Sequence, residues 1–87
     1  MRAYKVTVTD TPILLIAADN INRVAYISIV GARDIALGNS SVTFATGLLV
    51  EKHTAPLQFQ IPLGESLWAV SDTSLPDDVR VLLPDAD

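Results

Sequence analysis

The apolar residues of this chain fall in short runs, and glycine, proline, asparagine or aspartate ends most of them. Residues 4–9 and 57–61 alternate apolar and polar side chains, which is the period of a strand with one buried face. Residues 23–30, RVAYISIV, are rich in β-branched and aromatic side chains and predict the strongest strand. No window of roughly ten residues carries a helical apolar stripe without a glycine, proline or β-branched interruption. The chain is therefore expected to contain almost no helix.

About eight short strands are expected, separated by turn residues. They span residues 4–9, 13–17, 23–30, 34–37, 48–50, 57–61, 66–71 and 79–83, with an alternative in which residues 42–44 resume the fourth. Short strands at spacings of roughly ten residues predict an all-β fold, either a small antiparallel β-sandwich or a small barrel. The 87 residues allow one domain, which we assign to residues 1–83, followed by a short acidic tail at 84–87 that is expected to fray.

The composition indicates that part of the surface is buried against another protein. Hydrophobic residues make up 49% of the chain, and there is no cysteine. A domain of this size buries only about 60% of its unfolded surface and here has no disulfide to help, so its stability alone is marginal. No apolar run approaches the roughly 20 residues that span a bilayer, and the N-terminus has no secretion signal. We therefore expect no membrane partner and assembly in a cytoplasm.

The net charge of −4 lies in the last part of the chain. Acids and bases cancel up to Ser71, whereas from Asp72 onward five aspartates face only Arg80. Nucleic acids and anionic membranes bind basic patches, so neither is expected as a partner. The acidic stretch is expected to face solvent.

Residues with catalytic or metal-binding potential are few. His53 is the only histidine and lies in a polar turn, with no serine and carboxylate placed beside it as a triad requires. Asp72, Asp77 and Asp78 have the oxygen ligands that Ca²⁺ prefers but not the spacing of an EF-hand, so a solvated loop is favoured over a calcium site. The glycines are single and form no phosphate-binding motif. The sequence therefore predicts a protein that is not an enzyme and has no cofactor or metal.

Three residues stand out as candidates for contact or core positions. Trp68 lies in the apolar segment LWAV, which favours the core or an interface over an exposed platform for a sugar ring. Arg23 and Arg33 flank the strand at 23–30, where each either pairs across a subunit contact or is solvated. Both readings of the arginines stay open.

Several short motifs follow one another along most of the chain. They are VTVT at 6–9, LLIAADNINR at 14–23, DIALG at 34–38, SVTFATG at 41–47, ESLWAVS at 65–71 and DVRVL at 78–82. Their order resembles that of small virion proteins and head-fibre domains of tailed bacteriophages. The chain departs from that pattern at Ile29 and Val30, which replace Gln-Asn, and at Phe44, which is larger than usual. These departures add apolar character and are candidates for contacts.

The resemblance implies a structural role in the virion, as a capsid decoration protein, a cement protein or part of a head fibre. The implied partner is the major capsid protein or another virion protein, and the symmetric sites of a shell make a homotrimer the first expectation. The alternative is a module of a head fibre or tail that recognises a host glycan or receptor through Trp68 or residues 72–78. The candidate interface residues are Arg23, Tyr26, Ile29, Val30, Arg33, Phe44 and Trp68.

Overall fold

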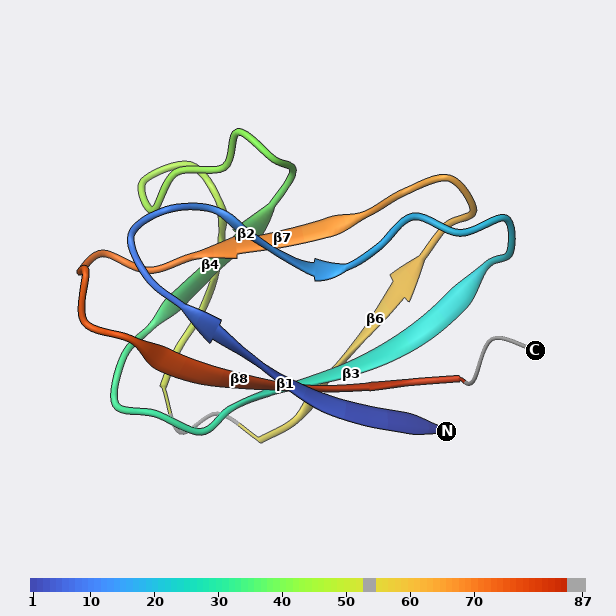
Figure 1. Cartoon of the computed structure of the whole chain (residues 1–87), viewed down its shortest axis with the longest axis horizontal. Coiled ribbons are helices and arrows are strands. Elements are labelled where there is room, and N and C mark those ends of the chain that lie inside the picture. The colour runs from blue at the N-terminus through green and yellow to red at the C-terminus, as the bar shows by residue number, and fades with distance from the viewer. Residues whose placement is uncertain (53–54, 85–87) are drawn as a thin grey trace.

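The computed structural model describes residues 1–52 and 55–84 and consists of eight β-strands in two layers (Figure 1). The strands are β1 (Arg2–Val8), β2 (Ile13–Ile16), β3 (Arg23–Ile29), β4 (Ile35–Gly38), β5 (Leu48–Val50), β6 (Leu57–Ile61), β7 (Leu67–Val70) and β8 (Asp77–Leu83). The all-β prediction is confirmed, and the layers form a sandwich-like arrangement. No helix long and apolar enough to cross a membrane occurs in the described residues. Apart from Pro84, the tail predicted at 84–87 lies outside them.

Both sheets are antiparallel and four-stranded. Sheet A has the order β1-β8-β3-β6, and sheet B has the order β2-β7-β4-β5. The strand at each position of sheet A is joined directly to the strand at the same position of sheet B, so β1 leads into β2 and β3 into β4. The connections at residues 9–12, 30–34 and 71–76 lie together at one end of the sandwich, on the left in Figure 1. We call these three connections the link end.

The link end is held together by an aspartate that the sequence led us to expect in solvent. Asp77 is only 7% exposed, and its Oδ2 accepts a hydrogen bond of 2.9 Å from the backbone N–H of Arg33. A Cβ at Gly31 would lie 1.1 Å from Oδ1 of Asp77, so only glycine fits beside the carboxylate. The expectation that the whole acidic stretch faces solvent is therefore wrong at Asp77. Its carboxylate satisfies backbone donors that the connection would otherwise leave unpaired.

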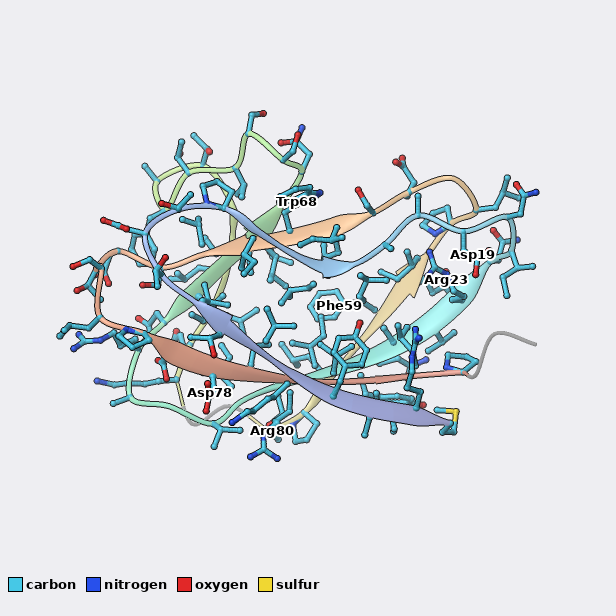
Figure 2. All side chains as sticks on the ribbon, viewed as in Figure 1. Asp19, Arg23, Phe59, Trp68, Asp78 and Arg80 are labelled. Carbon is cyan, nitrogen blue, oxygen red and sulfur yellow. The ribbon has the colours of Figure 1, made fainter. Side chains whose placement is uncertain are left out.

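The core lies between the sheets and follows from the alternation of the strands. In β3 and β8 every second side chain points inward, and Phe59 of β6 lies between the layers (Figure 2). Each fully buried aliphatic side chain contributes about 1.5 to 3 kcal/mol. The most buried large aliphatic side chains are Val8, Ile16, Ile27, Ile35, Val79, Val81 and Leu83.

Residues 39–47 form a tight loop and not a strand, so the alternative that extended a strand through 42–44 is wrong. The side-chain Oδ1 of Asn39 accepts hydrogen bonds from the backbone N–H and the hydroxyl of Ser41, at 3.0 and 2.9 Å. The hydroxyls of Thr43 and Thr46 lie 2.7 Å apart, and the N–H of Gly47 donates to the carbonyl of Thr43 at 2.9 Å. These local bonds replace a strand ladder because asparagine and threonine side chains compete for the backbone.

This loop covers the outer face of sheet B. Val42, at its centre, is 6% exposed and forms a second apolar cluster with Ala36 of β4 and Val70 of β7. A Cβ at Gly47 would lie 2.7 Å from Cγ2 of Val42 and 2.8 Å from Cβ of Ala36, so glycine is needed for the loop to lie this close. Sheet B is thus buried on both faces over this region.

Candidate protein-binding surface

Two of the candidate interface residues lie inside the sandwich. Ile29 is 5% exposed and belongs to the core, and Arg23 is 8% exposed because it occupies an inward position of β3. The Nη2 of Arg23 donates to the backbone carbonyl of Glu65 at 3.3 Å, and its buried Nε has no hydrogen-bond partner. Arg23 therefore ties the β6–β7 connection to the sandwich, at the end opposite the link end (Figure 2). Neither side chain is available to a partner in this fold.

Phe44 and Trp68 are half-buried against the cluster under the loop at 39–47. The indole Nε1–H of Trp68 donates to Oγ of Ser66 at 3.2 Å. Arg33 is half-buried at the link end, where its backbone is held by Asp77. The ring of Trp68 is therefore part of the packing of sheet B and does not stand free as a platform for a sugar.

Tyr26 and Val30 both belong to the outer face of sheet A. Tyr26 is 39% exposed, and Val30, just beyond the end of β3, is 51% exposed. Tyr26 lies opposite Leu82, which in turn lies opposite Ala3, so the three form one row across three strands. This row lies beside a groove of about 550 Å³ lined by Ala3, Tyr4, Lys5, Tyr26, Ser28, Pro56, Arg80, Val81 and Leu82.

The next row of the same face brings two cations together. Lys5 of β1 lies directly opposite Arg80 of β8, and Arg80 lies opposite Ser28 of β3. Figure 2 shows Arg80 pointing away from sheet B. Neither cation forms an ion pair with any residue in 1–52 or 55–84, and the carboxylate of Asp78, one row further, accepts a hydrogen bond from Thr7 at 3.3 Å. Like charges directly opposite each other destabilise a sheet, so this pair is not explained by the stability of the fold.

Tyr4 lines the groove, but its hydroxyl has a structural role. Its hydroxyl donates to the backbone carbonyl of Leu15 in β2 at 2.6 Å and so joins the two sheets. Burial raises the pKa of Tyr4, against the opposing effect of the charges on Arg2 and Arg23. The Arg2 guanidinium lies 5.4 Å from the centre of the Tyr4 ring. The phenol is therefore held protonated between the sheets.

The other chemical candidates were Asp72, Asp77 and Asp78 for calcium and His53 as a base. In the part of the chain that the structure describes, no group of three or more histidine, aspartate or glutamate residues is placed to hold a metal ion. His53 lies outside the described residues. What the outer face of sheet A offers is apolar contact and two positive charges, which suit binding.

The sequence alone did not bring Lys5, Arg80 and Leu82 into the site. The alternation of β1 and β8 places each of them on the outward side of its own strand. Only the register, which sets Lys5 against Arg80 and Leu82 against Tyr26, brings them together. Comparisons of the chain with protein-family models, curated proteins and solved structures find no match.

Proposed function

We propose that this protein is a non-enzymatic structural component of a bacteriophage particle, which decorates or cements the capsid through protein–protein contacts. The observation that carries the binding role is the outer face of sheet A, where an apolar groove beside Tyr26 and Leu82 stays uncovered. The order of sequence motifs, which resembles that of small phage virion proteins, supports the placement in a virion. A mixed apolar and charged face of this kind is typical of protein interfaces.

Such a role has a simple thermodynamic basis. A small domain that binds the assembled shell and not its free subunits stabilises the shell by mass action. The major capsid protein or another virion protein would then cover the groove. The alternative role in glycan recognition through Trp68 has less support, because that ring is half-buried and its indole N–H is bonded to Ser66.

The composition of purified particles tests the placement in the virion. Quantitative mass spectrometry of particles from the phage that encodes the chain should find it at a copy number that matches symmetric positions of the shell. Particles that lack it should form but lose their DNA at a lower temperature. Absence of the chain from purified particles would overturn the proposal.

A second experiment tests the surface. Tyr26→Ser with Leu82→Ser should lower binding of the purified chain to particles that lack it, because both changes remove apolar contact area from one row. Leu49→Ser is the matched control, since Leu49 is 48% exposed on the edge strand β5, away from sheet A. Equal loss in the control would show that the outer face of sheet A is not the contact.

A further inference from the structure

We propose that the groove on the outer face of sheet A receives the link end of a second copy of this chain, so that copies associate head to tail. The inference rests on the proposed function in treating that face as a protein contact, and it names the partner. Its starting observation is the pair Lys5 and Arg80, two cations that lie side by side and form no ion pair within residues 1–52 and 55–84, in a chain whose net charge is −4.

The cation pair opposes the simplest dimer, in which two copies pack face to face through sheet A. A two-fold contact brings the same patch of both copies together, so two copies of Lys5 and Arg80 would meet in one interface. Juxtaposed like charges oppose association by several kcal/mol. The occupant of the groove therefore presents negative charge.

The link end of the same chain presents that charge. Asp10 and Asp72 are both exposed, and the hydrogen bond of 2.8 Å from the N–H of Ser71 to the carbonyl of Thr9 holds their two connections together. Asp34 lies in the third connection and accepts a hydrogen bond from the backbone N–H of Lys52 at 2.8 Å.

Two cations also face this surface. Arg33 and Lys52 line the same shallow hollow as Asp34 and Asp72. With Asp10, the link end carries three carboxylates, and these outnumber the two cations. The charge of the link end is therefore opposite to that of the groove.

The link end also carries an apolar side chain that matches the groove. Leu75 is 55% exposed at the tip of the 71–76 connection. The connection is already ordered, because the Ser71 hydroxyl donates to the carbonyl of Thr73 at 3.1 Å and the N–H of Leu75 donates to Oγ1 of Thr73 at 3.2 Å. A preformed loop loses little conformational entropy on binding. Leu75 can contact Tyr26 and Leu82 of the next copy while Asp10 and Asp72 meet Lys5 and Arg80.

The two complementary surfaces cannot meet within one molecule. The link end occupies one end of the sandwich, whereas the outer face of sheet A runs along its length (Figure 1). The contact is therefore between different patches of two copies, and such contacts produce closed rings or open rows. A closed ring of three copies would be the homotrimer expected for a shell with symmetric sites.

Sedimentation analysis of the full chain, from about 1 μM to about 1 mM, tests the proposal in the range of weak protein contacts. The wild type should self-associate, and Lys5→Glu with Arg80→Glu should raise the dissociation constant at least about tenfold, because a charge pair at the contact is reversed. Arg2→Glu with Asn20→Asp and Leu63→Glu lowers the net charge by the same amount at exposed positions outside both the groove and the link end, and should not weaken association. A monomeric wild type over the whole range, or equal weakening by both variants, would overturn the proposal.

Reversing charges on the link end tests whether this end is the surface that contacts the groove. Asp10→Lys with Asp72→Lys should weaken self-association as the groove variant does, and an equimolar mixture of the two double variants should restore it. No recovery in the mixture means that these surfaces do not face each other, and the head-to-tail contact is then wrong. A monomeric chain that still binds particles through Tyr26 and Leu82 would overturn the second copy as occupant while leaving the proposed function in place.

Discussion

The two outer faces of the sandwich differ in what covers them. On sheet B, the loop at 39–47 folds back and buries Val42 against Ala36 and Val70. On sheet A, Tyr26 and the Lys5–Arg80 pair are exposed, and the groove beside them has no cover from the described chain. Within the described residues, the chain therefore covers one outer face by itself and leaves the other open.

Topology explains the difference. The connection from β4 to β5 is the one that stays within a sheet, since every other pair of consecutive strands lies in different sheets. A hairpin loop can fold over its own sheet, and residues 39–47 do so. Sheet A contains no consecutive strands, so all of its connections lead to sheet B, and within the described residues only Pro56 of these connections lines the groove on its outer face.

The largest expected effect comes from the covered face. Gly47→Ala should destabilise the protein by about 3 kcal/mol, because the new Cβ would meet Val42, Ala36 and the backbone carbonyl of Leu37 at 2.7, 2.8 and 2.9 Å. Chemical denaturation measures this change. Gly64→Asn is the control, because Gly64 has φ +80° and open space around it, and asparagine tolerates that conformation at a cost below about 1 kcal/mol. A small effect at Gly47 would mean that the loop at 39–47 does not pack tightly against sheet B.

The next largest difference is expected between truncations of one side chain on each outer face. Val42→Ala should cost about 2 kcal/mol, since it empties part of a buried cluster, whereas Tyr26→Ala should cost less than about 1 kcal/mol because its ring is exposed in the free protein. Thermal or urea unfolding of both variants provides the comparison. Equal costs would break the distinction between a covered and an open face.

Tyr4→Phe tests a hydrogen bond between the two sheets, and its free-energy cost is a reference for the changes on the two outer faces. Losing the hydrogen bond to the carbonyl of Leu15 should cost about 1 kcal/mol at neutral pH. Because burial raises the pKa of Tyr4 above its ordinary value of 10.0, the folded state favours the neutral phenol. This contribution is present below pH 10.0 and is lost as pH rises through the folded-state pKa. Stability measured from neutral to alkaline pH should therefore fall less steeply in Tyr4→Phe; an identical decline would contradict the assignment.

The smallest expected effect is a gain of stability on the open face. Lys5→Thr removes one of two like charges placed directly opposite each other and should stabilise the monomer by a few tenths of a kcal/mol. Urea denaturation at low ionic strength detects the gain, and added salt should reduce it. A loss of stability would show that Lys5 has a structural partner and would weaken the case for a binding role.

The strands were largely predictable, because alternation and turn residues act locally. The eight segments and their approximate bounds follow from that pattern, as at 57–61, where prediction and structure agree. A turn after Gly38 was predicted, but residues 42–44 were left open as a resumed strand, since the β-branched residues of SVTF suit a strand and only the bonds around Asn39 and Thr43 show that the loop continues. Asp77 was misassigned because its partner, the backbone at Arg33, is 44 residues away in sequence.

What the sequence by itself determined is the kind of structure, an all-β fold of short strands in which alternation marks the buried face of each strand. The tertiary structure decided which surface is left open, because strand order and register are long-range properties. Ile29 was drawn into the core, while Lys5 and Arg80, 75 residues apart in the chain, came to lie side by side. A period of two tells which side of its own strand a residue occupies, and only pairing tells what lies beside it.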